Sequence, residues 1–238
     1  MGQKRFSFNH LICVGLFAAL VSGCVGERSF YISQNQVPSS TCTVSSTESS
    51  ELYLPRGLLD ISVDKGYYVF PLLNSALSAS KSDDGEPERN NLFIREFKVE
   101  VDLGIVPGTF SPELTNFTVP QSGILRPGGS RAFFVKVLKD ELIARLDKSK
   151  ISAFRPTVTV KIQAVGEIGG STLESMPFYF PIELCSNCLV TRLNACPVSG
   201  ADDWPKLSQS NSCGYPQDTL VQCCDDSQKG LICLPGSG

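Results

Sequence analysis

The cysteines divide this chain into regions that must be held together by different means. Residues 52–184 contain no cysteine, whereas residues 185–238 contain seven of the ten cysteines in the chain: Cys185, Cys188, Cys196, Cys213, Cys223, Cys224 and Cys233. Such a density is typical of a disulfide scaffold with little apolar core of its own. The cysteine-free stretch is long enough to bury a core without crosslinks. We therefore expect a globular body over 52–184 and a cysteine-rich module over 185–238.

Apolar and polar residues alternate along several segments of the body. Alternation is strict over 59–63, 97–103, 133–137, 157–164 and 178–184, an apolar run covers 67–73, and 115–119 is a weaker candidate. Because successive side chains of a strand point to opposite faces, these patterns indicate about seven half-buried strands. We expect the apolar stripes to form the core, including Phe97, Val99, Val101, Val160 and Ile162. Apolar residues at helical spacing occur only over 139–147.

Seven strands without alternating helices favour an all-β fold, an antiparallel sandwich, with a small barrel as the alternative. The pattern resembles the immunoglobulin superfamily, although the cysteine pair and core tryptophan of antibody domains are absent. Segments 154–166 and 172–184, joined by glycines, are expected to form the last hairpin. Since 52–184 has its own apolar stripes and no cysteine, we expect this body to fold alone.

The first 24 residues have the organisation of an export signal. Lys4 and Arg5 precede an apolar run over 11–21, which is too short to span a membrane and is typical of a signal-peptide core. The following Val21-Ser22-Gly23-Cys24 resembles the lipobox of bacterial lipoproteins. That resemblance implies cleavage after residue 23, acylation of Cys24 and attachment to the membrane through the lipid. Val25, in place of Asp, favours the outer membrane. An ordinary secretory signal is the alternative.

Residues 24–51 are rich in serine and threonine, with Pro38 in the middle. Such a segment has little apolar surface to offset its ordering entropy, so we expect a flexible tether. Cys42 is its exception. Because the seven tail cysteines cannot all pair among themselves, we expect Cys42 to bond to one of them, which leaves a free tether over 25–41 and a reach of at most about 55 Å. The spacing does not name the partner, and a Cys42–Cys42 dimer is the competing outcome.

Composition excludes several functions. The only histidine, His10, lies in the expected signal segment, so the mature protein would lack imidazole for Ser-His-Asp catalysis or metal binding. A net charge of -3 gives no basic excess for nucleic-acid binding. Ser62-x-x-Lys65 and Ser78-x-x-Lys81 lack the companion boxes of Ser-Lys enzymes. We therefore expect no catalytic residues, no cofactor and no metal.

Cys185-Ser186-Asn187-Cys188 has three interpretations. A zinc site would need a second suitable pair, and the adjacent Cys223-Cys224 suits tetrahedral zinc poorly. A thioredoxin-like motif should open a helix, whereas this one follows a strand. We favour half-cystines of structural disulfides, because an exported protein meets an oxidising compartment. Thiol–disulfide exchange by Cys185 and Cys188 remains the rival function.

Two further features contain residue types that are common in binding sites. The acidic segment 83–88 lacks the register of a calcium loop and is expected to be solvated. Trp204 and Tyr215 lie beside prolines and are expected to form a small core of the module rather than a recognition patch. The sequence thus predicts a lipid-anchored envelope protein with a binding or scaffolding role and a protein or glycan partner that it does not identify. An inhibitor-like cysteine module displayed on a sandwich is a further alternative.

Overall fold

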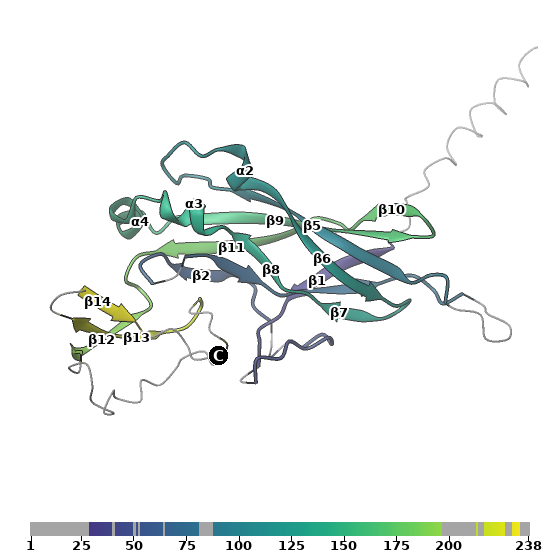
Figure 1. Cartoon of the computed structure of the whole chain (residues 1–238), viewed down its shortest axis with the longest axis horizontal. Helices are drawn as coiled ribbons and strands as arrows, with labels where there is room; N and C mark the ends of the chain where they lie inside the picture. The colour runs from purple at the N-terminus through teal and green to yellow at the C-terminus, as the bar shows by residue number, and fades with distance from the viewer. Residues whose placement is uncertain are drawn as a thin grey trace, which may run out of the picture.

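The computed structural model describes residues 29–39, 41–49, 51, 53–63, 65–80, 88–196, 213, 217–226 and 230–233. The predicted signal segment, the lipidation site Cys24, most of the acidic segment 83–88 and the aromatic residues Trp204 and Tyr215 lie outside the described residues. Most of the described elements are strands, arranged in several sheets (Figure 1). The all-β fold expected from the alternating segments is confirmed.

The largest sheet contains the strands with the clearest sequence alternation. Its order is β2 (Gly57–Asp60), β11 (Phe178–Cys185), β9 (Thr157–Ile168), β5 (Leu92–Asp102) and β6 (Asn116–Leu125), and β10 (Ser171–Glu174) also pairs with β9. Neighbouring strands are antiparallel except for β2 and β11, which run parallel. The expected last hairpin is β9 and β11, with β10 inserted between them in sequence. The segment 154–156 is not part of it, because Phe154 ends a helix.

A second layer lies against this sheet. It combines a three-stranded sheet of β1 (Phe30–Asn35), β4 (Pro71–Ser75) and β7 (Ser130–Ala132) with the pair β3 (Tyr67–Val69) and β8 (Val135–Leu138). Only Phe70 separates β3 from β4, so the apolar run predicted over 67–73 forms two consecutive strands, one in each of these sheets.

The core lies between the two layers. Phe97, Val99, Val101, Val160 and Ile162 are all buried, with exposed fractions of 0–5%, as the sequence predicted. They belong to one apolar cluster with residues of β1, β3, β4 and β8 from the opposite layer. Both layers therefore share a single core, which supplies the main apolar stabilisation of the body.

The expectation of a flexible tether is corrected for residues 30–35, which form strand β1 of the second layer. β1 pairs antiparallel with β4, and Phe30 and Ile32 point into the core with exposed fractions of 1% and 8%. The two apolar residues alternate with Tyr31 and Ser33, a period of two that is too short to stand out within a serine-rich segment. The body thus begins before residue 52.

In the residues that the structure describes, three short helices accompany the sheets. They are α2 (Pro112–Thr115), α3 (Asp140–Ala144) and α4 (Lys148–Phe154). The helical spacing predicted over 139–147 corresponds to α3, and Leu142 and Leu146 are buried. Asp147 caps α4 by accepting a hydrogen bond from the Ser149 amide at 3.0 Å. In the described part of the chain, no helix combines the length and the apolar character that a membrane span requires.

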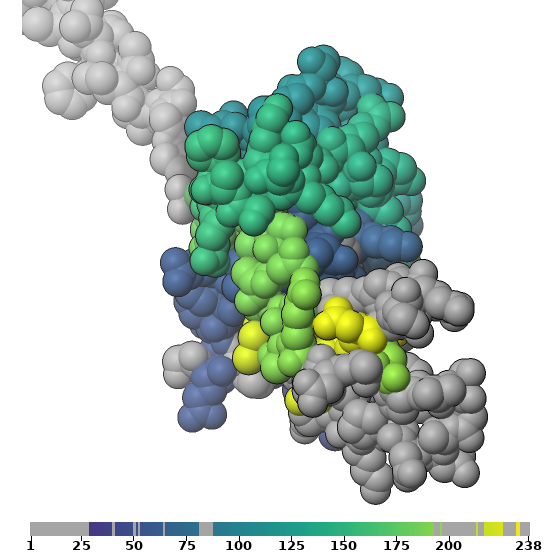
Figure 2. Space-filling view, turned by 90° about the vertical axis from the view of Figure 1, so that its left-hand side faces the viewer, coloured from purple at the N-terminus to yellow at the C-terminus, as the bar shows by residue number. Residues whose placement is uncertain are grey.

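The C-terminal region forms a small sheet of its own. Its strands are β12 (Val190–Ala195), β13 (Val221–Asp226) and β14 (Gly230–Cys233), with β12 parallel and β14 antiparallel to β13. Figure 2 shows this end of the molecule, where the yellow C-terminal residues pack against the light-green stretch that follows β11. The eight cysteines of the described chain form four disulfides: Cys42–Cys213, Cys185–Cys188, Cys196–Cys224 and Cys223–Cys233.

Candidate functional site

The junction between the body and the C-terminal tail contains most of the buried polar side chains among the described residues, and we take it as the candidate site. Its first component is Asp60, the last residue of β2, whose side chain is only 1% exposed. Its Oδ1 accepts hydrogen bonds from the Ser62 amide at 3.0 Å and the Ser62 hydroxyl at 2.6 Å. The same oxygen accepts from the Asn187 amide at 2.9 Å, and Oδ2 accepts from the Leu189 amide at 2.9 Å. Hydrogen bonds from protein groups therefore replace the water that this buried carboxylate has lost.

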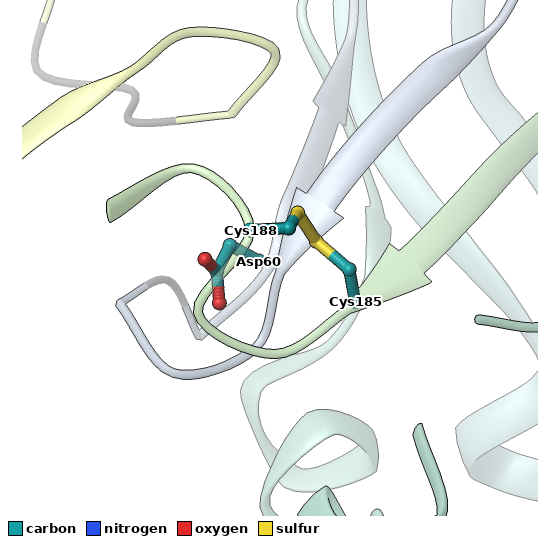
Figure 3. A group of neighbouring side chains, drawn as sticks. All are labelled: Asp60, Cys185 and Cys188. Carbon is teal, nitrogen blue, oxygen red and sulfur yellow. A yellow bond between two sulfur atoms is a disulfide. The ribbon is translucent and has the colours of Figure 1, made fainter. Parts of the chain in front are cut away.

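These bonds fix the loop that contains Cys185 and Cys188, which are joined to each other (Figure 3). Asn187 adopts a φ of 59°, a left-handed conformation that asparagine tolerates better than most residues. Cys185 is the last residue of β11, and it is 1% exposed. Asp60 therefore acts as a buried support for the Cys-x-x-Cys loop.

The same three side chains form a geometric group that could hold a metal ion, because their ligand atoms lie within 4.8 Å of one another. Their bonding does not suit a metal. Both sulfur atoms are used in the disulfide, and both carboxylate oxygens already accept amide hydrogen bonds. Zinc binds cysteine as the thiolate, so this group fits a metal only after reduction and loss of the loop contacts.

The second component is Gln217, which completes the exposed edge of β3. Its Oε1 accepts a hydrogen bond from the Tyr68 amide at 2.8 Å, and its Nε2 donates to the Tyr68 carbonyl at 2.7 Å. A side-chain amide has the same donor and acceptor as a peptide group, so Gln217 takes the place of a neighbouring strand. Its side chain is buried at 5% exposure.

Asp218 does the same for β2, the edge strand of the large sheet. Its amide donates to the Leu58 carbonyl at 3.0 Å, and its Oδ1 accepts from the Leu58 amide at 2.6 Å. Its Oδ2 accepts from the Tyr67 hydroxyl at 2.6 Å. Asp218 has a φ of 63°, so the backbone adopts a left-handed conformation to place these groups. The two polar residues thus close the gap between the edges of the two sheets.

Tyr67 is the buried partner of this contact. Burial, followed by the nearby Asp218 carboxylate, raises the pKa of the Tyr67 hydroxyl well above its usual value, so the hydroxyl stays protonated and donates. Gly57 makes room for it, because a Cβ at residue 57 would overlap the Tyr67 hydroxyl. The glycine, the tyrosine and the tail aspartate are therefore one packed unit.

The Cys42–Cys213 disulfide ties the tail beside this unit. It joins residues 171 apart in sequence, with a Cα–Cα distance of 5.1 Å. Cys213 is the tail partner that the sequence required for Cys42 but did not name. Cys42 is exposed, whereas Cys185 of the Cys-x-x-Cys loop is buried. Cys188 and Cys213 are both half-buried, so the long-range link contains the most exposed cysteine of these two disulfides.

A pocket of about 150 Å³ lies where the end of β1, the β3–β4 bend and the tail meet. Its walls include apolar side chains from the body, together with polar residues from both the body and the tail. The lining residues are Asn35, Gln36, Val37, Pro38, Leu54, Phe70, Gln217, Asp218 and Thr219.

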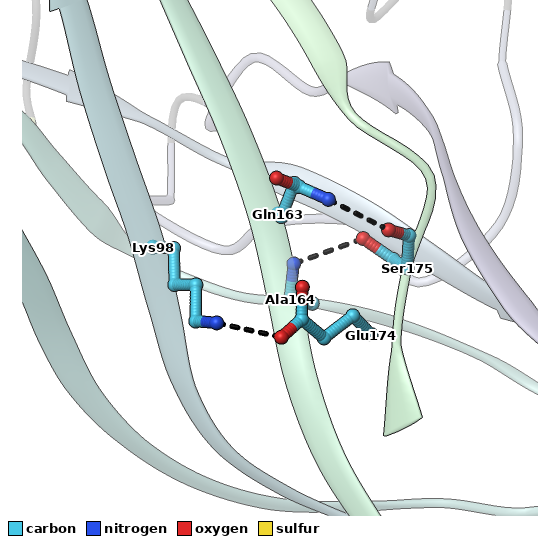
Figure 4. A network of polar contacts seen from close by, with 5 residues as sticks. All are labelled: Lys98, Gln163, Ala164, Glu174 and Ser175. Atoms are coloured by element: carbon cyan, nitrogen blue, oxygen red, sulfur yellow. Dashed lines mark hydrogen bonds and ion pairs between the residues drawn. The ribbon is translucent and has the colours of Figure 1, made fainter. Parts of the chain in front are cut away.

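The outer face of the large sheet has a different character. Lys98 pairs with Glu174 at 2.6 Å, and similar cross-strand pairs join Arg95 to Glu167 and Lys161 to Glu100. Beside the first pair, the Ala164 amide donates to the Ser175 hydroxyl at 2.9 Å, and Gln163 donates to the Ser175 carbonyl (Figure 4). These contacts hold the β10 segment on β9. The ion pairs are exposed and contribute little free energy each.

The important residues that sequence reasoning missed are Asp60, Gln217 and Asp218. Asp60 lies between Leu59 and Ile61, so the alternation placed it on a solvent-facing side of a strand. Instead, the returning tail covers that side. The sequence contains no periodic signal for the tail pair, because Gln217 and Asp218 act by docking on distant backbone groups.

The comparisons with known proteins add no relative: no family model and no curated protein matches this chain.

Proposed function

We propose that this chain is a lipid-anchored, non-enzymatic protein of the bacterial envelope with a binding role. The observation that carries the proposal is the N-terminal segment, in which a basic start and a short apolar run lead directly to Val21-Ser22-Gly23-Cys24. Lipid on Cys24 would attach the protein to the membrane, and Val25 favours the outer membrane. The partner is a protein, a glycan or a small molecule held by the folded body.

The four disulfides support export. Disulfides persist in oxidising compartments such as the periplasm and the cell surface, and they are rare in the reducing cytosol. All eight cysteines of the described chain are paired, including one pair that links segments 171 residues apart. These bonds therefore suit an oxidising compartment outside the cytosol, to which the N-terminal segment would direct the chain.

The site favours binding over thiol–disulfide exchange by Cys185 and Cys188. Exchange requires a thiolate to reach a disulfide sulfur in line. The Cys185 side chain is 1% exposed, and Asp60 binds the loop amides on both sides of Cys188. Cys188 is half-buried, and the bonds to Asp60 restrain the loop, which disfavours the in-line approach that exchange requires.

Strand β1 alters how far the body would extend from the membrane. Five residues, 25–29, lie between Cys24 and the start of β1 at Phe30. An extended chain spans at most about 3.5 Å per residue, so this link reaches less than about 20 Å. The proposed protein therefore holds its sandwich close to the bilayer instead of on a long tether.

Membrane attachment can be tested with two single-cysteine variants of the full chain. Cys24→Ala should move the protein from the detergent phase to the aqueous phase on detergent phase partitioning and should abolish incorporation of a labelled fatty acid. Cys13→Ala is the matched control, because Cys13 lies in the segment that would be removed, and it should behave as the wild type. Retention of Cys24→Ala in the detergent phase would refute lipid anchoring through this cysteine.

A further inference from the structure

The four disulfides differ in how exposed their cysteines are. Three of them contain a cysteine that is nearly or fully buried: Cys185 at 1% exposure, Cys224 at 3% and Cys223 at 0%. The Cys42–Cys213 bond contains no buried cysteine, since Cys213 is half-buried and Cys42 is the only exposed cysteine among the described residues. Because a thiolate must reach a sulfur atom to reduce a disulfide, this bond is the most accessible of the four.

A short turn presents Cys42 to solvent. The Cys42 amide donates to the Ser39 carbonyl at 2.9 Å, and the Ser39 amide donates to the Thr43 carbonyl at 2.8 Å. The Ser39 hydroxyl is hydrogen-bonded to the hydroxyl of Thr43 at 2.8 Å. None of these bonds involves the Cys42 sulfur. The turn should therefore keep Cys42 in place after its bond to Cys213 opens, so that the bond can form again.

Open space adjoins the disulfide. A hollow of about 280 Å³ lies beside the bond, and both of its cysteines belong to the wall. The wall also includes Pro38, Val44 and Phe134. An attacking sulfur needs room to approach the S–S bond, and the hollow can accept the groups that flank that sulfur.

Charge also favours attack on this bond over attack on the Cys-x-x-Cys pair. Residues 29–47, which include Cys42, contain no charged side chain. The ligand atoms of Asp60, Cys185 and Cys188 lie within 4.8 Å of one another, so a carboxylate lies beside that second disulfide. A negative charge at this distance repels an incoming thiolate and disfavours the thiolate that leaves. Accessibility and charge therefore select the same bond.

We propose that Cys42–Cys213 is a thiol–disulfide exchange site, at which this protein is the substrate of a dithiol reductant. One thiolate of the reductant attacks Cys42 Sγ and forms a mixed disulfide, and Cys213 leaves as a thiolate and takes up a proton. The second thiolate of the reductant then attacks the mixed disulfide and releases Cys42. Two electrons pass from the reductant, which ends as a disulfide, and its two thiol protons end on Cys42 and Cys213.

Opening this bond would disconnect the segment after β1 from the tail without dismantling the fold. Neither cysteine belongs to the apolar core, and Gln217 and Asp218 still bind the edges of β3 and β2. Reduction of the other three pairs requires local unfolding, because each contains a buried cysteine. The inference goes beyond the proposed function and does not depend on Cys24, so the partitioning assay and thiol labelling fail separately.

Differential alkylation of the purified full chain tests the proposal. Thiols that are free at the start, including any at Cys13 or Cys24, are blocked with N-ethylmaleimide. The protein is then treated with dithiothreitol, and new thiols are labelled with the deuterated reagent. Peptide mapping should show Cys42 and Cys213 labelled at least about tenfold faster than the cysteines of the other pairs, with a cooperative thermal transition retained. The proposal is overturned if another pair is labelled first or if all four open together.

A trapping reaction identifies the sulfur that is attacked. Thioredoxin that lacks its second active-site cysteine cannot complete the exchange, so it should remain bonded to Cys42 rather than to Cys213. Cys42→Ser combined with Cys213→Ser is the control, which keeps the other three disulfides and should form no adduct. An adduct of equal yield with this double variant would place the exchange at a different bond. Faster reduction by intact thioredoxin than by dithiothreitol identifies a protein dithiol as the reductant, and the reverse identifies a small thiol.

The contribution of charge has a matched pair of variants at Val44, which is half-buried in the wall of the hollow. Val44→Asp should slow reduction by glutathione, which is anionic, about fivefold at low ionic strength. Val44→Asn has nearly the same shape without the charge, and its rate should stay within about twofold of the wild type. Equal rates for the two variants would contradict the electrostatic preference for this bond.

Discussion

Whereas a continuous apolar core between two layers holds the sandwich, disulfides and two polar residues hold the tail that follows Cys185. In the body, most of the fully buried side chains belong to apolar stripes, such as Phe97 and Val160. In the tail, Gln217 and Asp218 bond to the backbone of Leu58 and Tyr68, and three disulfides lie within the segment or at its start. The difference shows that the tail is ordered by attachment to the body rather than by a core of its own.

The dependence also runs in the other direction. The tail completes the edges of β2 and β3, and an uncovered edge leaves backbone donors and acceptors without partners. The core itself includes Phe30 and Ile32 from the segment before residue 52. The expectation that 52–184 folds alone is therefore revised, because that fragment would lack a strand on one side and the tail contacts on the other.

The largest expected effect is the loss of β1 from the core. In the full chain, Phe30→Asp combined with Ile32→Asp places two charges where the side chains are 1% and 8% exposed, and we expect cooperative thermal unfolding to disappear. Tyr31→Asp is the control on the opposite face, where the side chain is 39% exposed, and it should retain a cooperative transition. A normal melt of the double variant would show that the sandwich is independent of β1.

A single core residue should have the next largest effect. Phe97 is fully buried and packs at 5.4 Å between ring centroids against Phe133, so Phe97→Ala should reduce the free energy of unfolding by about 3–5 kcal/mol. Phe93→Ala, on the same strand but 42% exposed, should cost much less. Urea denaturation of both variants measures the difference, and equal losses would contradict the assignment of the core face.

The tail contact should contribute less than the core. Asp218→Ala leaves the Leu58 amide and the Tyr67 hydroxyl without their acceptors, and we expect a loss of about 1–3 kcal/mol in the free energy of unfolding. Asp225→Ala, at an exposed position of β13, should change stability by less than about 0.5 kcal/mol. A similar effect of both substitutions would mean that the tail does not dock through Asp218.

The smallest expected effect is a decrease in the free energy of unfolding at alkaline pH. The pKa of Tyr67 is raised in the folded protein by burial and by Asp218, so the folded state keeps this proton after the unfolded state has lost it near pH 10. This contribution to stability is complete below pH 10 and is lost as the pH rises above it, by up to about 1.4 kcal/mol per pH unit. Urea denaturation from pH 8 to 11 should show a steeper decline for the wild type than for Tyr67→Phe. Parallel declines would exclude Tyr67 as the source.

Local periodicity predicted the parts of the fold that depend on one segment at a time. The stripes of β5, β9 and β11 identified both the strands and their buried faces. The parallel pairing of β2 with β11 was not predicted, because alternation specifies a face but not a neighbour. Strand β1 was hidden because only Phe30 and Ile32 mark its buried face within a polar segment.

The candidate site was harder to predict than the fold because its residues act at long range. An odd number of tail cysteines required a partner for Cys42, but only the folded chain brings Cys213 to it. Gln217 and Asp218 have no local pattern, since their function is to replace a strand that the sheet lacks. Asp60 was interpreted as a solvent-facing strand residue because the sequence does not reveal what covers a strand edge.

The position of the Cys42–Cys213 bond has a mechanical consequence. A force applied between a membrane anchor at the N-terminus and a partner bound near the C-terminus would pass from Cys42 directly to Cys213. Residues 43–195, which include all of β2 to β12, lie within the closed covalent loop and off the short covalent path, whereas the Cys196–Cys224 disulfide lets the stretch from Cys196 to Cys213 share the load. Among the described strands, β1 and the start of β13 are in the path of the load, because the Cys223–Cys233 disulfide bypasses the rest of β13 and most of β14. A protein held at a moving envelope could thus lose its first strand under tension while the loop that contains most of its core stays unloaded.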